Sequence, residues 1–280
     1  MFPSPEQIRM AAYFRWQRGG WRHGRDGVDW VAAEQDLLFS LNYRVVARYR
    51  LDAPEEIRIG DGRRKVCRFC EQSAPRAAFS GPVRSIPADL GNTALLSCDT
   101  CDECRAAFAR GIVADFAAFA RPYLGGPARP PAPGVPIGAF KGLASMALTI
   151  LPAGELDFFR DALEWVANPD HAQDGGSFGD LGCYLHHTPS PSGHPWAALA
   201  RRVEADAPFP YMLFFLGTPA VTFELPVPLC ARDEDLDGDV MFVPRVAAPG
   251  EPGPADGPCT FIPIATAAVA RRGPRPKAVG

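Results

Sequence analysis

The chain has 280 residues, 47% of them hydrophobic, and a formal net charge of −3, which suits one large soluble domain or two smaller ones. It contains no run of about 18 apolar residues, so we expect no membrane-spanning helix. Residues 1–6 lack the charged start and apolar run of a signal peptide, so we expect a cytoplasmic protein. Thiols stay reduced in that compartment, where clustered cysteines bind metal more often than they form disulfides.

Positive charge is concentrated in the N-terminal half of the chain. Residues 1–125 hold 18 Lys and Arg against 15 Asp and Glu, whereas residues 126–280 hold 11 against 17. Nearly all of these cations are arginines, which bind phosphate through two parallel hydrogen bonds. An excess of three is compatible with a nucleic-acid partner but is too small to establish one.

The first 50 residues have the pattern of two helices. Ser4, Pro5 and Gln7 make a helix N-cap, a first-turn proline and a capping box. A second helix is expected from about Gly27 to Leu41, where apolar residues recur at helical spacing. Residues 43–50 fit either a strand or a continuation of that helix, and residues 52–65 fit a charged linker.

A spaced set of residues in this segment surrounds a His-Gly-Arg-Asp run. The set comprises Ile8, Ala12, Tyr13, Trp16, Gly20, His23, Gly24, Arg25, Asp26, Trp30, Ala33 and Glu34. It resembles a short bacterial family catalogued only as a domain of unknown function, which implies no particular chemistry. We therefore predict a two-helix domain of unknown function over residues 1–50, which can serve as a surface for a protein partner.

Two Cys-x-x-Cys pairs form the most specific pattern in the chain. Cys67 and Cys70 make the first pair, and Cys101 and Cys104 make the second. Four soft sulfurs at this spacing suit one tetrahedral zinc ion of structural type. Cys98 adds a third thiol at equal spacing before the second pair, so an iron–sulfur cluster is the alternative.

The segment from Cys101 to Arg105 resembles the Cys-Asp-Glu-Cys-Asn signature of a bacterial HNH-endonuclease family. Ile86-Pro87 and Leu90-Gly91-Asn92 also match that family's frame. The resemblance implies a treble-clef-like zinc module over residues 60–123, in which four cysteines brace a nuclease unit. Arg84 stands where the family carries its histidine base, and Arg105 stands where it carries asparagine.

These two exchanges change the chemistry that we expect. Phosphodiester hydrolysis needs a base with a pKa near neutral, which histidine supplies and arginine cannot. An arginine can hold a phosphate without cutting it. We therefore predict a zinc-stabilised protein that binds DNA or RNA through Arg84 and Arg105 and has no catalytic residue.

Three alternatives stay open at this point. The arginines can instead form local salt bridges with Asp89, Asp102 or Asp115. The module can be an active HNH-type nuclease, which would require magnesium. The whole chain can be a protein-interaction scaffold that ignores nucleic acid.

A Pro/Gly-rich run over residues 125–136 precedes a C-terminal domain that we expect over residues 138–268. Residues 140–228 resemble the C-terminal part of some proteins that carry this HNH variant. The expected elements are one helix over 102–119, a second over 139–151, a third opening at 152, a loop over 168–195, and strands at 211–216, 221–225, 240–243 and 260–264. The predicted fold class is α+β, with a two-helix unit, a treble-clef or HNH-like module and a helix-then-strand domain.

Overall fold

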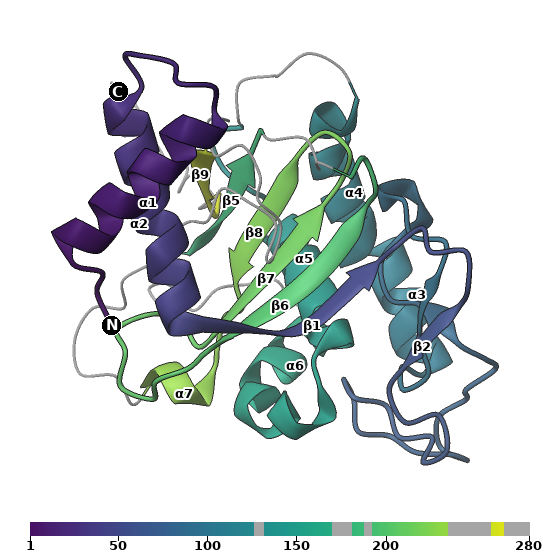
Figure 1. Cartoon of the computed structure of the whole chain (residues 1–280). Coiled ribbons are helices and arrows are strands. Elements are labelled where there is room, and N and C mark those ends of the chain that lie inside the picture. The colour runs from purple at the N-terminus through teal and green to yellow at the C-terminus, as the bar shows by residue number, and fades with distance from the viewer. Residues whose placement is uncertain (126–131, 170–180, 188–191, 235–258, 266–280) are drawn as a thin grey trace, which may run out of the picture.

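The computed structural model describes residues 1–125, 132–169, 181–187, 192–234 and 259–265, which form two sheets flanked by helices (Figure 1). The helical segments are α1 (Pro5–Arg18), α2 (Asp26–Asn42), η1 (Ala88–Leu90), α3 (Asp102–Arg110), α4 (Ile112–Leu124), α5 (Ile137–Ile150), η2 (Ala153–Phe159), α6 (Arg160–Ala167) and α7 (Ala231–Glu234). The strands are β1 (Tyr43–Arg50), β2 (Ile57–Ile59), β3 (Val83–Arg84), β4 (Leu95–Ser97), β5 (Gly182–His186), β6 (Trp196–Arg202), β7 (Met212–Gly217), β8 (Thr222–Pro226) and β9 (Cys259–Pro263). The predicted mixed α+β class is confirmed.

Six antiparallel strands form the large sheet, in the order β1-β6-β7-β8-β5-β9. Strand β1 lies at one edge, where Tyr43 is opposite Arg202. The segment that fitted either a strand or a helix is therefore a strand, because β6 supplies its hydrogen-bonding partner. The domain boundaries 1–50, 60–123 and 138–268 stay a prediction, but the end of the first segment contributes an edge strand to the sheet of the third.

Side chains alternate between the two faces of the large sheet, and each face contributes to a core. On one face, Leu199, Phe214 and Phe223 belong to the main core, which also contains residues of α4 and α5. On the other face, Phe215 packs against Phe39 of α2, with ring centroids 6.0 Å apart. Helix α2 thus anchors the N-terminal unit to the sheet.

Helix α5 is buried on all sides and packs closely against α4. All of its residues from Gly138 to Ile150 are buried. A Cβ atom at Gly142 would overlap the carbonyl oxygen of Ile112, and one at Gly138 would overlap the carboxylate of Asp115. The two glycines therefore let the two helix backbones approach each other. Across the described ranges, no helix combines the length and apolar character needed to cross a membrane.

Several elements differ from the sequence-based expectation. The single helix predicted over residues 102–119 is two helices, α3 and α4, which divide at Gly111. The predicted linker contains β2, and the predicted loop over residues 168–195 contains β5. Strand β6 reads WAALARR, which has little intrinsic strand preference, so pairing with its neighbours overrides local propensity. The strand predicted at 240–243 lies outside the described residues.

We expect Gly142→Ala to destabilise the protein by about 1–3 kcal/mol, because the added methyl group must push α5 away from Ile112. Alanine is the better helix former by about 1 kcal/mol, so a loss of stability identifies packing as the cause. Urea unfolding followed by circular dichroism measures the difference. Gly27→Ala in α2 is the matched control, because no atom lies within 4 Å of its added Cβ. Equal or raised stability of Gly142→Ala would contradict this packing.

Candidate metal centre

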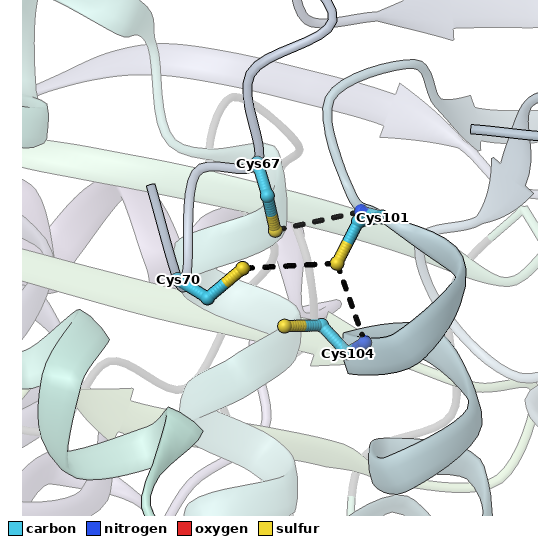
Figure 2. A group of neighbouring side chains, drawn as sticks. All are labelled: Cys67, Cys70, Cys101 and Cys104. Atoms are coloured by element: carbon cyan, nitrogen blue, oxygen red, sulfur yellow. Dashed lines mark hydrogen bonds between the residues drawn. The ribbon is translucent and has the colours of Figure 1, made fainter. Parts of the chain in front are cut away.

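Four cysteine sulfurs converge between a turn and the start of helix α3 (Figure 2). Cys67 and Cys70 come from the turn, whereas Cys101 is the N-cap of α3 and Cys104 lies in its first turn. The four sulfurs all lie within 4.8 Å of one another, and those of Cys70 and Cys101 are 3.7 Å apart. The structure therefore brings together the four cysteines predicted as metal ligands.

Backbone hydrogen bonds shape both halves of this cluster. In the turn, the Glu71 N–H donates to the carbonyl oxygen of Cys67, and Glu71 adopts a left-handed conformation with φ 56°. The Cys101 N–H donates to the sulfur of Cys67, and the Cys104 N–H donates to the sulfur of Cys101, both at 3.4 Å. The positive end of the helix and these N–H groups favour thiolates over thiols.

The crowded thiols also perturb one another's ionisation. The hydrogen bond from the Cys104 thiol lowers the pKa of Cys67 to about 4. The same hydrogen bond raises the pKa of Cys104 well above its usual value, and burial raises the pKa of Cys70 to about 11. A divalent cation would remove this conflict, because its charge allows all four sulfurs to ionise.

The spacing of the sulfurs fits a tetrahedral metal ion such as zinc. A zinc–sulfur bond of about 2.3 Å places tetrahedral sulfurs about 3.8 Å apart. The separation of 3.7 Å between Cys70 and Cys101 agrees with this value. Four protein ligands would fill the coordination sphere, as in structural sites. Cys98 lies outside the cluster that the described residues form.

A buried ion pair ties the cysteine turn to the rest of the fold. Arg68, inside the first Cys-x-x-Cys pair, contacts both carboxylate oxygens of Asp99, at 3.0 and 2.6 Å. Its Nη1 donates to the carbonyl oxygens of Leu148 and Leu151 at the end of α5, at 2.6 and 3.1 Å. Only 3% of the Arg68 side chain is exposed. The structural role of Arg68 was not predicted from the sequence. The feature that could have indicated it is a charged residue between the two metal-ligand candidates Cys67 and Cys70.

The residues that match the HNH frame have clear structural roles. Asn92 is fully buried, and its side-chain amide donates to the carbonyl oxygens of Ile86 and Leu95. Its carbonyl oxygen accepts from the Leu95 N–H at 2.8 Å. Gly91 has φ 89°, and a Cβ there would overlap Pro195, which directly precedes β6. The frame thus holds the β3–β4 connection and packs it on the large sheet.

The two arginines predicted to bind nucleic acid lie on different elements of this module. Arg84 ends strand β3, is exposed, and has no ion pair with the described part of the chain. Arg105 lies in α3, where its guanidinium is 3.2 Å from the carboxylate of Asp102. Hydrogen bonds from Ser80 hold that carboxylate and lower its pKa. A local salt bridge is therefore present at Arg105, whereas Arg84 is available to a ligand.

Another polar pair, which sequence analysis missed, is buried in the large sheet. His186 Nε2 of β5 and Glu224 Oε2 of β8 are 2.6 Å apart, with side chains 1% and 0% exposed. Tyr184 lies opposite Glu224, and burial raises the pKa of this tyrosine to about 12. The signal in the sequence is Glu224 between the apolar residues Phe223 and Leu225 at the centre of β8. The hydrogen bond offsets the free-energy cost of burying two polar side chains. Because it forms only when β5 and β8 are correctly aligned, it helps to fix their register.

Comparison with known proteins yields one family. Residues 3–38 match the family model described as "Protein of unknown function (DUF2934)". This confirms the predicted resemblance of α1 and most of α2 to a family of unknown function. No curated protein and no solved structure matches the chain. No HNH family matches either, so that likeness rests on the motif residues alone.

Purified protein is expected to contain about one zinc ion per chain, because four thiolates complete one tetrahedral site. Cys67→Ser should release it, since a hydroxyl is a poor replacement for a thiolate ligand. Elemental analysis of the protein after gel filtration measures the metal content. Cys98→Ser is the matched control and should keep its zinc. Iron and inorganic sulfide in equal amounts would instead indicate an iron–sulfur cluster.

Proposed function

We propose that this chain is a zinc-stabilised nucleic-acid-binding protein, derived from an HNH endonuclease and without cleavage activity. The observation that carries this proposal is the exposed Arg84, in the same segment of the chain as the four-cysteine cluster. The motif likeness aligns this arginine with the histidine base of the nuclease family. A cation at that position attracts the phosphate that an active relative would cut.

The order of elements supports a treble-clef zinc module. The cysteine turn is followed by the antiparallel pair β3–β4 and then by helix α3, whose first turn provides two sulfurs. Turn, hairpin and helix around one four-thiolate site is the treble-clef arrangement. In such a module the zinc ion stabilises the fold outright and takes no part in chemistry.

Exposed cations on the same segment favour a polyanionic partner. Residues 57–84 contain seven Lys and Arg against two Asp and Glu. One of the seven is the buried Arg68, and the exposed ones are Arg58, Arg63, Arg64, Lys65, Arg76 and Arg84. Arg58 and Arg64 form exposed ion pairs with Glu56 and Asp61, which contribute little to stability and can exchange for phosphate contacts. Exposed cations of this kind bind the phosphate backbone of DNA or RNA with little regard to sequence.

The residues of this module argue against cleavage. Hydrolysis needs a general base near neutral pKa, and a guanidinium stays protonated at every physiological pH. The sequence contains no histidine between residues 69 and 170. A zinc ion held by four thiolates has no open position at which it can activate water.

We expect the protein to bind DNA or RNA, and the salt dependence of the affinity shows whether Arg84 and Arg105 contact phosphates. The dissociation constant for a short labelled DNA duplex or RNA hairpin should rise steeply with salt in fluorescence anisotropy. Each phosphate contact contributes about 0.9 to the slope of log K against log salt concentration, so Arg84→Gln with Arg105→Gln should reduce the slope by about 2. Arg44→Gln, an exposed arginine of β1 outside the cysteine module, is the control and should leave the slope unchanged.

Other results of these assays would favour one of the alternative functions. An unchanged slope in the double variant removes both arginines from the interface. Failure to bind any nucleic acid favours the interaction scaffold and overturns the proposal. Nicking of plasmid DNA by the wild-type protein in magnesium or manganese would show an active nuclease, provided that Arg84→Gln changes its rate.

A further inference from the structure

Helix α1 and its connection to α2 expose several large aromatic side chains. Ile8 is the one buried residue of α1. Tyr13, Phe14 and Trp21 are exposed over 46%, 49% and 49% of their surfaces. Single exposed apolar residues are common, but a group of aromatic rings on one surface marks an interaction site. In Figure 1 the two helices lie at the upper left, far from α3 at the right.

The aromatic rings contact one another, and Trp16 holds them in position. The centroids of Tyr13 and Phe14 are 5.8 Å apart, and those of Tyr13 and Trp21 are 6.4 Å apart. Trp21 packs edge-on against the half-buried Trp16 at 4.6 Å. The indole N–H of Trp16 donates to the carbonyl oxygen of Arg22 at 3.0 Å, which holds the connection in place. Rings held in this way lose little entropy when a ligand stacks on them.

The backbone at Trp21 is in a strained conformation. Trp21 has φ 60°, in the left-handed region that bulky side chains rarely adopt, and it follows Gly20 with φ 78°. The Trp21 N–H donates to the carbonyl oxygen of Trp16 at 3.1 Å. Strain of this kind is retained most often where function requires it. Half of the ring remains in solvent, so filling the core does not explain the strain.

Charge around the rings is positive. Residues 7–25 contain five arginines and no Asp or Glu. Arg15 pairs with Asp36 of α2 at 2.6 Å, and the Arg9 guanidinium contacts the exposed Glu6. Arg18 and Arg22 are exposed and form no ion pair with any described residue. Two unpaired guanidinium groups therefore flank the aromatic group, which is charge-complementary to phosphate.

An open hollow of about 380 Å³ lies beside these groups and is lined by Phe14, Gln17 and Arg18. Its wall combines an aromatic ring, an amide and a guanidinium. The Arg18 Nε donates to the carbonyl oxygen of Phe14 at 3.3 Å, which uses one of the five N–H donors of this guanidinium. A nucleotide needs these three chemistries, since its base stacks, its edge forms hydrogen bonds and its phosphate is anionic.

We infer that this surface, made of Tyr13, Phe14, Gln17, Arg18, Trp21 and Arg22, binds single-stranded nucleic acid by stacking of bases on its rings. Arg18 and Arg22 contact the phosphates, and Gln17 contacts a base edge in the hollow. The strand must be single, because paired and stacked bases do not offer their faces to side chains. The surface lies on elements other than those that carry Arg84 and Arg105, so the inference stands independently of the proposed function.

The direct test uses the full-length protein and a labelled oligothymidylate of about 12 nucleotides, a length within the usual site sizes of single-strand binders. Fluorescence anisotropy gives the dissociation constant, and quenching of tryptophan emission reports stacking. Trp21→Ala should weaken binding roughly 5- to 100-fold, the range found when one stacking ring is removed. Arg18→Gln with Arg22→Gln should weaken it and reduce its salt dependence.

Control substitutions show whether the loss of binding is specific to the ring of Trp21. Trp30→Ala removes another exposed tryptophan, 37% exposed in α2, and should leave binding unchanged. Trp21→Phe keeps a ring and should restore most of the affinity lost in Trp21→Ala. Unchanged circular dichroism and zinc content show that each variant is folded. A duplex of the same sequence should bind more weakly to this surface than the single strand.

Two results would overturn the inference. One is equal binding of the oligothymidylate by wild-type protein and Trp21→Ala. The other is a concentration-dependent dimer, lost in Trp21→Ala, in a protein that does not bind the single strand, because the rings would then form a protein interface. The variants at Arg84 and Arg105 should not affect oligothymidylate stacking, so failure of the proposed function is separable from failure here.

Discussion

The buried pair of Arg68 and Asp99 is the interaction on which the arrangement of this protein depends. Arg68 belongs to the cysteine turn, Asp99 precedes the second pair of cysteines, and the same guanidinium closes the carbonyl end of α5. Removing one partner of a buried pair leaves an uncompensated charge and costs about 3–5 kcal/mol. The pair therefore requires both halves of the cysteine cluster to stay in place, and a metal ion bound by the four sulfurs would hold them there.

The cysteine module is joined to the large sheet at further points. Helix α4 packs on α5 through glycines, Gly91 lies against Pro195, and the Leu51 N–H donates to the Pro195 carbonyl oxygen at 2.9 Å. These contacts explain the Leu90-Gly91-Asn92 frame as architecture rather than chemistry. A scaffold built in this way keeps its motif residues after the catalytic ones have been replaced, which is the history that we propose for Arg84. Helices α1 and α3 lie on opposite sides of the molecule in Figure 1, so each offers a surface of its own.

Features of the fold and the site that depend on nearby residues were predictable from the sequence, whereas those that depend on residues far apart in the chain were not. The capping box of Ser4 and Gln7 follows from local spacing, and the convergence of the four cysteines follows from the ligand chemistry of two Cys-x-x-Cys pairs. The structure confirms both. The β1–β6 pairing was beyond prediction because its partners lie about 150 residues apart and the Ala-rich β6 carries no strand signal. The roles of Arg68 and of the His186–Glu224 pair depend on burial, which one sequence does not reveal. The left-handed backbone conformation of Trp21 could not be predicted either, since glycine is the residue expected at such a conformation.

We propose that a metal ion in the four-cysteine cluster holds the cysteine module on α5, and hydrogen exchange after treatment with a chelator tests this most directly. Full-length protein is compared by mass spectrometry with and without a chelator, with β7 and β8 as the internal reference. We predict faster exchange in residues 95–104 and, through Arg68, in the last turn of α5 at residues 148–151. Faster exchange confined to the two cysteine segments, with α5 unchanged, would contradict the account.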